Sequence, residues 1–440
     1  MFLRRFTGVC FLVLAIVLFA SFSMVEAVEE PDFPDEIEGE HELTFWSWMP
    51  GVEEAVEAFE EKYPNVTVDH ENVGVGPDHY DQLMTVIAAG DGAPDVTMME
   101  YGYLPQFIDT GGIKEIGQFG FDEYEDYFLD WTWDSVVRDG EIYAIPWDQG
   151  PNAFMYRQDL FEEAGIDELP STWEDFREAA EQLQEYHGDD VYIANFDTSS
   201  RDEFQSYPWQ AEAQWFTEED GTWTINISDP ETQMVAEFWG EMIEDGLIST
   251  HDNDPDYIAA LSDGEIAGQL APSWEPALTA DEVPEQEGKW RIEHMPQWEE
   301  QDELVSSNWG GSTTAVTTQS ESPEVAAIFA RWIATSKEAN KIHFEAGGSF
   351  PVTHYGLNME ILYEPDEFYG GQVLTEIYEE AAEGVPDWQF SPWTTHVDEA
   401  FEMAFAQAVD GDIGWIEALE LMEEEIEREA EFGGYDVIVD

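Results

Sequence analysis

The chain has 440 residues, of which 43% are apolar and 14% aromatic, a composition typical of a globular protein long enough for two sizeable cores. It carries 100 acidic and only 14 basic residues, which gives a formal net charge of -86. Clustered Lys and Arg, which bind nucleic acid and anionic lipid, are missing outside the first five residues, so we expect neither partner. Self-repulsion of this size is screened when the Debye length falls to roughly 3 Å at molar salt, and we therefore predict a protein exposed to high salt.

The N-terminus has the pattern of an export signal. Two arginines precede an apolar run at 9–22 and a small-residue cleavage site, so residues 1–27 are predicted to be a signal peptide and 28–40 a flexible acidic lead-in. The single cysteine, Cys10, lies at the start of the apolar run, and a lipid-anchor motif is not apparent. No later run is long enough to span a bilayer. We expect an exported protein in the periplasm or at the cell exterior, without membrane insertion of the mature chain.

Strand-like apolar runs alternate with runs of helical period between residues 43 and 112. This β-α-β-α-β order predicts an open parallel sheet covered by helices, whose ligands bind beyond the carboxyl ends of the strands. The residues at those ends are Trp46 and Trp48 after the first strand, and Glu100 and Tyr101 after the third. Aromatic faces beside a carboxylate suit a sugar, because C–H faces stack on rings while hydroxyls need polar partners. Trp46 could equally be a core residue, because alternate residues of a strand face opposite sides.

The same stretch also resembles a known family. The segments FWSW, AFEEKYPNVTV, IAAGDGAPDVTMME and YLPQFIDTGGI are similar to the N-terminal signature of the family 1 extracellular solute-binding proteins, the carbohydrate receptors of ATP-driven (ABC) importers. Later segments resemble that family in the same order, among them LSDGEIAGQLAPSW. The segment DEFYGGQVLTEIYEEAAEGVPDWQFSPW and the Pro-Trp-Asp-x-Gly-Pro loop resemble members that bind lactose or arabinose oligosaccharides.

The resemblance implies an α/β fold of the two-lobed periplasmic-binding-protein type (type II). Each lobe would be a mostly parallel sheet flanked by helices, and a hinge of three chain crossings would join the lobes. The chain would cross between the lobes after residues 147, 310 and 350. Residues 41–147 and 311–350 would then form lobe I, and residues 148–310 and 351–440 would form lobe II.

Candidate ligand contacts lie on the predicted hinge loops. Asp148 and Gln149 follow the first crossing, although Asp148 also fits a turn residue. Gly310 and Gly311 would let the backbone approach a bound molecule closely and would serve as a second hinge. Trp274, at the end of a small-residue strand, is the predicted stacking residue.

Trp388 is a further candidate, for which packing between helices is an equally good explanation. The predicted ligand-binding residues are therefore Trp48, Glu100, Tyr101, Asp148, Gln149, Trp274, Gly310, Gly311 and Trp388. No catalytic residue, cofactor or metal site is predicted; the acidic run from Asp252 to Asp263 lacks the turn glycine of a calcium loop and contains Pro255.

Two functions from different classes fit these observations. The leading hypothesis is a non-catalytic, monomeric receptor that delivers a mono- or oligosaccharide to the permease of an ABC importer by closing its lobes. The alternative is a secreted, salt-adapted glycoside hydrolase, which would also combine tryptophans with paired carboxylates. In a chain with 100 acidic residues, carboxylate spacing cannot favour the hydrolase. The absence of internal repeats disfavours a third possibility, a salt-dependent surface adhesin.

Overall fold

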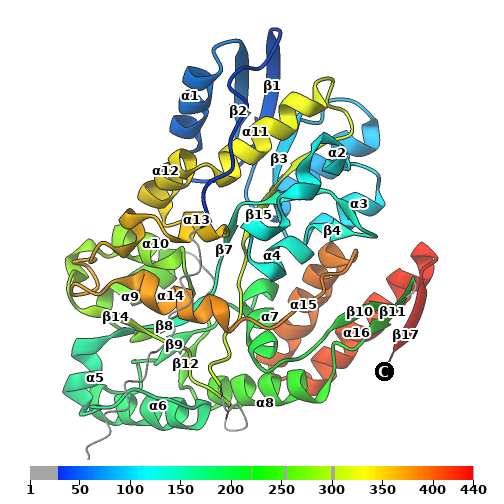
Figure 1. Ribbon diagram of the computed structural model, residues 1–440. Helices are drawn as coiled ribbons and strands as arrows, with labels where there is room; N and C mark the ends of the chain where they lie inside the picture. Colours follow the sequence, from blue (N-terminus) through cyan, green and yellow to red (C-terminus); the bar gives the residue numbers. More distant parts are fainter. Residues whose placement is uncertain (1–27, 220, 252–254, 299–302, 440) are drawn as a thin grey trace, which may run out of the picture.

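The computed structural model describes residues 28–219, 221–251, 255–298 and 303–439; the predicted signal peptide lies outside these ranges. The chain forms two lobes, each built around its own sheet, with the short strand β7 between them (Figure 1). Within the described ranges, every helix is too short or too polar to cross a bilayer.

Lobe I contains a five-stranded sheet with the strand order β2-β1-β3-β15-β6. Its strands are β1 (His41–Trp46), β2 (Val66–Glu71), β3 (Val96–Glu100), β6 (Ala144–Pro146) and β15 (Ser312–Val316). Strand β1 pairs in parallel with β2 and β3, whereas β15 runs antiparallel to both of its neighbours, β3 and β6. All strands except β15 therefore share one direction, and the sheet is mostly parallel as predicted.

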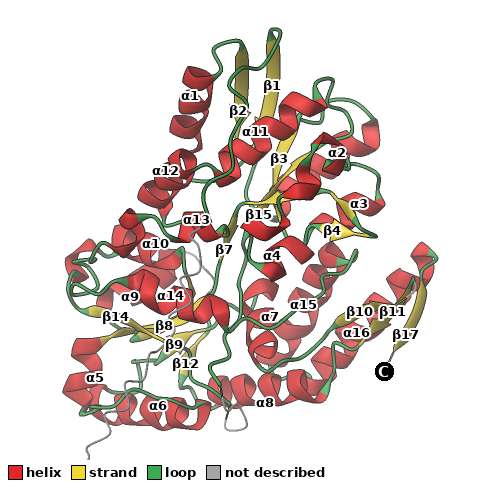
Figure 2. Cartoon of the chain, in the orientation of Figure 1, coloured by secondary structure: helices red, strands yellow, loops and turns green. Residues whose placement is uncertain are grey.

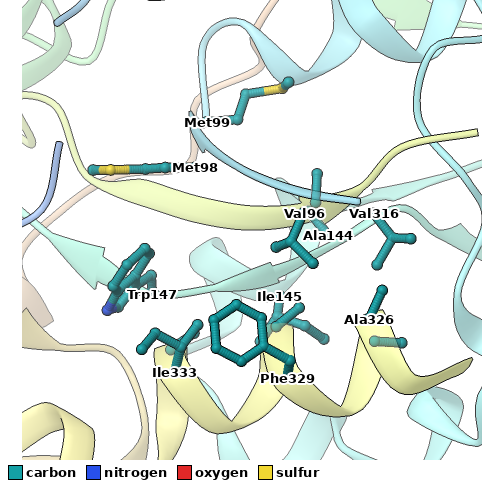
Figure 3. Close-up of a cluster of buried hydrophobic side chains, with 14 of the residues drawn as sticks. Val96, Met98, Met99, Ala144, Ile145, Trp147, Val316, Ala326, Phe329 and Ile333 are labelled. Atoms are coloured by element: carbon teal, nitrogen blue, oxygen red, sulfur yellow. The ribbon is translucent and has the colours of Figure 1, made fainter. Parts of the chain in front are cut away.

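The helices of lobe I cover both faces of this sheet. They are α1 (Val52–Lys62), α2 (Pro77–Ala89), α3 (Leu104–Asp109), α4 (Asp130–Asp134), α11 (Pro323–Thr335) and α12 (Lys337–Gly347), with the short strands β4 (Val137–Arg138) and β5 (Glu141–Ile142) beside them. Helix α1 buries Val52, Val56 and Phe59, the face that the periodicity predicts. Helix α11 packs in the same way: Figure 3 shows Phe329 and Ile333 facing the cluster of buried side chains on the sheet.

Lobe II contains a similar sheet with one reversed strand. Strand β8 (Asn152–Arg157) pairs antiparallel with β13 (Gly268–Pro272) and β14 (Trp290–Glu293). Strands β9 (Ala194–Asn195) and β12 (Ile248–Ser249) pair in parallel, and a parallel bridge between Tyr192 and Ile266 links them to β13. The reversed strands β8 and β15 are each the first strand after a hinge crossing. The first strand of a lobe that follows a crossing runs away from the hinge. The other strands of both sheets run toward the hinge.

Helices surround the lobe II sheet, and a small second sheet projects at the edge of the lobe (Figure 2). The helices are α5 (Gln158–Ala164), α6 (Trp173–His187), α7 (Arg201–Gln210), α8 (Pro230–Glu244), α9 (Pro255–Asp263), α10 (Glu275–Glu282), α14 (Leu374–Glu383), α15 (Thr394–Val409) and α16 (Trp415–Gly433). The projecting sheet consists of β10 (Phe216–Glu219), β11 (Thr222–Ile225) and β17 (Asp436–Val439). Thr172 caps the N-terminus of α6, because its hydroxyl accepts the N–H of Asp175 at 3.1 Å.

Part of the acidic lead-in predicted to be flexible packs against lobe I. Residues 28–40 form no helix or strand, but Ile37 is buried in the lobe I core. The Arg331 guanidinium lies 4.0 Å from the centre of the Phe33 ring and donates to the Asp32 carbonyl at 3.0 Å. These two apolar side chains hold an otherwise charged segment on the lobe.

Candidate functional site

Three chain crossings lie side by side between the lobes. Strand β7 (Asp148–Gln149) pairs antiparallel with β16 (Phe350–Pro351), which leads into the short helix α13 (His354–Leu357). The remaining crossing, at residues 308–311, runs beside β7, because the Trp309 N–H donates to the Gly150 carbonyl at 2.8 Å. Gly311 has φ of 82°, and a Cβ there would lie 3.0 Å from the Asp148 carbonyl oxygen, so this crossing needs glycine.

The two predicted polar contacts on the first crossing hold the hinge together. The Asp148 carboxylate is buried and accepts the Ser312 N–H at 2.7 Å. Burial raises its pKa to about 7, and the hydrogen bonds from Ser312 offset this only in part. Gln149 is fully buried and donates to the Pro351 carbonyl at 3.0 Å. The structure gives both residues a structural role, and ligand contact by either stays a prediction.

An inner pocket opens beside the hinge, between the lobes. Lobe I contributes the end of β3 and the residues after it, lobe II contributes α7 and the loop before α15, and the hinge forms the floor. The lining residues are Glu100, Gly102, Tyr103, Asp202, Gln205, Trp209, Asn308, Gly310 and Phe390. The pocket combines two carboxyl groups and amide groups with aromatic rings, groups that suit the hydroxyls and C–H faces of a sugar. Its volume is about 10 Å³, room for a single water, so a sugar ring would enter only with the lobes further apart.

Charged side chains behind this pocket form a connected network. Arg201 is buried; its Nε donates to Asp398 at 2.6 Å, and its Nη1 lies 2.5 Å from an Asp202 oxygen. The Tyr103 hydroxyl donates to the other Asp398 oxygen at 2.5 Å, so the network reaches from lobe II into lobe I. The two bonds to carboxylates are short and charge-assisted, and Nη1 also donates to Gln205 at 2.9 Å, whereas the buried Nη2 has no hydrogen-bond partner among the described residues.

Glu100 faces this network from lobe I. Its carboxylate accepts the Tyr80 hydroxyl at 2.9 Å. Burial and, after it, the negative charge of Asp202 raise the pKa of Glu100 to about 8, although the hydrogen bond from Tyr80 and the charge of Arg201 oppose this in part. The inner pocket is thus an environment in which added negative charge is unfavourable.

A wider outer hollow continues from the inner pocket toward solvent. Phe390 lines both spaces, and Trp388, which lines the outer hollow, stacks on Trp209 of the inner pocket with ring centres 5.0 Å apart. Aromatic and apolar side chains form much of the wall: Pro105, Ile108, Trp131, Val137, Trp223, Trp388 and Phe390. The polar lining residues are Asp134, Ser135, Arg138, Gln214, Glu218, Asp387 and Gln389. The outer hollow has a volume of about 380 Å³, much larger than the inner pocket.

Trp131 is one of the rings that line this outer hollow. Its indole N–H is buried, and no described residue accepts a hydrogen bond from it. The ring packs against Tyr101 of lobe I, with centres 5.3 Å apart, and edge-on against Trp209 of lobe II at 6.2 Å. A buried donor without a partner is costly, and a ligand oxygen could satisfy it.

Four of the predicted ligand-binding residues lie at or beside these two spaces. Trp388 lines the outer hollow, and Glu100 and Gly310 line the inner pocket. Trp274 is half-buried at the start of α10, edge-on to Trp309 at 5.7 Å and close to Gly310, so it lies at the hinge beside the inner pocket.

Trp48 and Tyr101 line neither space. Trp48 packs edge-on against His79 at 4.9 Å. Tyr101 is fully buried under Gly311, whose Cβ position would be 3.1 Å from the ring.

Sequence reasoning missed several residues of the site. Tyr103, Asp202, Trp209 and Phe390 line the inner pocket, and Trp131 lines the outer hollow. The local signal for the aromatic residues among them is that their segments are rich in Trp, Tyr and Phe. Packing in a core explains that richness equally well.

Comparisons with known proteins agree with this geometry. A family model described as bacterial extracellular solute-binding protein matches residues 54–355. The chain is 27% identical over 391 residues to the arabinooligosaccharide-binding protein of Halalkalibacterium halodurans, covering 83% of this chain and 84% of that protein. It is also 27% identical over 392 residues to the lactose-binding protein of Rhizobium radiobacter, covering 84% and 89%.

A solved structure gives the same picture. The ABC transporter associated binding protein of B. animalis subsp. lactis, in complex with beta-1,6-galactobiose, superimposes with a TM-score of 0.81 at 28% identity, covering 91% of this chain and 100% of that one. These matches confirm the two-lobed fold and the family resemblance that the sequence predicts.

Proposed function

The chain belongs to the bacterial extracellular solute-binding protein family, and we propose that it is the carbohydrate receptor of an ABC importer, which takes an oligosaccharide between its two lobes. One observation carries this proposal: an inner pocket and an outer hollow lie between the lobes beside the hinge, share Phe390, and are lined by rings together with carboxylates and amides. Rings stack on the C–H faces of sugars, while polar groups accept and donate hydroxyl hydrogen bonds.

Lobe closure would both bind the sugar and present the receptor to the permease. Contacts already join the lobes directly: the Thr394 hydroxyl on α15 donates to the Gly102 carbonyl at 2.5 Å, and the Thr395 hydroxyl donates to Gln106 at 3.0 Å. A sugar bound between the lobes, in the outer hollow of about 380 Å³ and against the residues of the inner pocket, would touch both lobes and so favour closure around it. The family is extracellular, and we extend this to a monomeric, exported protein that works in high salt.

The hydrolase alternative has no support beyond the abundance of carboxylates. The relatives are named as binding proteins. A glycosidase needs two carboxyl groups that flank the scissile bond, one on each side. Among the described residues, no group of three or more His, Cys, Asp or Glu is placed to hold a metal ion.

The test is a titration with lactose, maltose, beta-1,6-galactobiose and arabinotriose in about 2 M salt, where the screening length is a few Å. Tryptophan fluorescence should change on binding, because Trp131, Trp209 and Trp388 lie at the site. Released reducing ends are measured in the same samples. Saturable binding without new reducing ends supports the receptor, whereas turnover of any of the sugars would favour the hydrolase.

A further inference from the structure

Closure of the lobes gathers carboxyl groups from both of them around the inner pocket. Glu100 ends β3 in lobe I, and Asp202 lies on α7 in lobe II. Both line this pocket, whose volume of about 10 Å³ leaves room for a single water. Arg201 binds Asp202 and also Asp398 of α15, so three carboxyl groups lie around one guanidinium group.

The guanidinium group pairs with the two aspartates of its own lobe. Its Nη1 lies 2.5 Å from Asp202 and its Nε 2.6 Å from Asp398, whereas Glu100 forms no ion pair with any described residue. The Glu100 carboxyl group instead accepts a hydrogen bond from the neutral Tyr80 hydroxyl, at 2.9 Å within lobe I. Three carboxylates beside one guanidinium would leave negative charge in excess where little water is present to solvate it. Glu100 has no ionic partner, so it is the group that should hold a proton when the lobes are closed.

The titratable and charged groups that face Glu100 come from α2, the residues after β3, α7 and α15. They are Tyr80, Tyr103, Arg201, Asp202 and Asp398, of which only Arg201 is a cation. His79, beside Tyr80, stays uncharged at neutral pH because burial lowers its pKa to about 4. On the hinge, Asp148 has a pKa of about 7 and bonds to Ser312, the neighbour of Glu100 in the sheet. Its titration overlaps that of Glu100, and a substitution at Glu100 separates the two.

The proton affinity of Glu100 depends on whether the lobes are together. In the closed arrangement burial, followed by the charge of Asp202, raises its pKa from the ordinary value of 4.5 to about 8. Burial also raises the pKa of Asp202, although Arg201 opposes this. When the lobes separate, Arg201, Asp202 and Asp398 move away with lobe II and water reaches Glu100, so its pKa should return toward the ordinary value.

We propose that the lobes take up a proton on Glu100 as they close, and that the receptor therefore holds its sugar more weakly in alkaline medium. This inference rests on the proposed function, because it names the regulation of the same site. The closed arrangement binds the proton more tightly than the open one. Its contribution to closure is therefore complete below about pH 4.5 and is lost as the pH rises through about 8. A neutral sugar between the lobes preserves this difference, because it displaces water from the same carboxyl groups and brings no charge to balance them.

The experiment measures sugar affinity and proton uptake together. Lactose, maltose, beta-1,6-galactobiose and arabinotriose are titrated in a calorimeter at about pH 7 and about pH 9.5, on either side of the proposed titration. The salt concentration is about 2 M, which screens the exposed carboxylates. At each pH, two buffers with different heats of ionisation give the number of protons taken up with each sugar.

The proteins are the wild type, Glu100→Gln and the matched control Glu203→Gln. Glutamine keeps a hydrogen-bond acceptor and imitates the uncharged carboxyl group. Glu203 is buried on α7 next to Asp202 and has a pKa of about 8, as Glu100 has, but its hydrogen-bond partners Tyr207 and Asp197 belong to lobe II. A third variant, Asp202→Asn, removes the charge that lobe II brings to Glu100. Melting temperatures verify that each protein is folded.

For the sugar that binds most tightly, wild type and Glu203→Gln should take up close to one proton at about pH 7. They should bind that sugar roughly tenfold more weakly at about pH 9.5, a factor that follows from a pKa of about 8 for Glu100 in the closed arrangement. Glu100→Gln should lose most of this proton uptake, and its affinity should change less than about threefold over the same range. Asp202→Asn should take up less of a proton at about pH 7 than the wild type, because Glu100 then has a lower pKa when the lobes are closed.

Proton uptake and pH dependence that Glu100→Gln retains would overturn the inference. Their loss in Glu203→Gln would also overturn it, because the effect would then belong to α7 rather than to contact between the lobes. If Glu100→Gln does not fold, Asp202→Asn decides, and proton uptake equal to that of the wild type would count against the role of lobe II. In each of these outcomes the sugar still binds, so the receptor function stands. A wild type that binds none of the sugars would overturn the receptor function, and with it the control of sugar release by pH.

Discussion

The hydrogen bond between Tyr103 and Asp398 can be removed with little other change, and its removal tests whether closure of the lobes sets the sugar affinity. Tyr103 follows β3 in lobe I, and Asp398 lies on α15 in lobe II, so their 2.5 Å bond exists only while the lobes are together. Tyr103→Phe keeps the ring, which stacks on Tyr80 with centres 3.6 Å apart. Asp398 keeps its bond to Arg201, and no buried charge is left unpaired.

The expected magnitude follows from the chemistry of this bond. Hydrogen bonds to charged groups contribute about 1.5 to 3 kcal/mol. About a quarter of the Asp398 side chain is exposed, so we take the lower part of that range, about 1.5 to 2 kcal/mol. When the open form predominates without ligand, the loss appears in full in the apparent affinity, which should fall roughly 10- to 30-fold.

A second variant separates closure from direct sugar contact, because Tyr103 also lines the inner pocket. Thr395→Val removes the hydroxyl bond to Gln106 across the lobes and leaves only the longer bond from the Thr395 backbone N–H, at 3.4 Å; Thr395 lines neither the inner pocket nor the outer hollow. Loss of a neutral hydrogen bond should cost about 0.5 to 1.5 kcal/mol and weaken sugar binding roughly 2- to 10-fold.

Calorimetry gives the dissociation constants, and X-ray scattering gives the radius of gyration with and without lactose. We expect both variants to have the larger, open radius without sugar and to need more sugar to reach the closed one. Unchanged affinity and radius in both variants would refute the argument that these bonds hold the lobes closed.

Four further outcomes are expected. Trp388→Ala should weaken sugar binding about ten- to hundredfold, from roughly 1 to 3 kcal/mol of lost stacking and burial, and should also lower the melting temperature because Trp388 stacks on Trp209. Trp274→Ala should weaken binding over the same range with little loss of stability, because Trp274 is half-buried at the hinge; unchanged affinity with a large loss of stability would place it in the core instead. Burial raises the pKa of Glu203 from 4.5 to about 8, so the folded state binds more protons and stability should fall as pH rises through that window; melting curves of Glu203→Gln should depend less on pH there. The melting temperature should be much lower in about 0.1 M than in about 2 M salt, with potassium and sodium compared to detect specific cation binding.

The sequence by itself determined the alternation of strands and helices between residues 43 and 112. Apolar periodicity is a local property, and Val52, Val56 and Phe59 lie on the buried face of α1 because a helix of 3.6 residues per turn puts them there. Gly310 and Gly311 indicated a crossing because consecutive glycines permit positive φ, and both residues have it.

Only the tertiary structure decided which polar and aromatic side chains meet. The sequence predicts ligand contact for Asp148 and Gln149, which stays a prediction, but it does not show that the fold brings Ser312 and Pro351 within hydrogen-bonding distance of their side chains. A sequence shows which side chains can form hydrogen bonds. Whether another part of the protein supplies the partner depends on segments far away in the chain.

The site itself is assembled from such distant segments. Glu100, Asp202 and Phe390 come from lobe I, α7 and the loop before α15, and no local pattern links them. In a chain with 100 acidic residues, the identity of a carboxylate carries almost no information about its role. What distinguishes Glu100 and Asp202 is their position beside the hinge, close to Arg201, whose guanidinium pairs with Asp202 itself and with Asp398, and that position exists only once the two lobes have folded and come together.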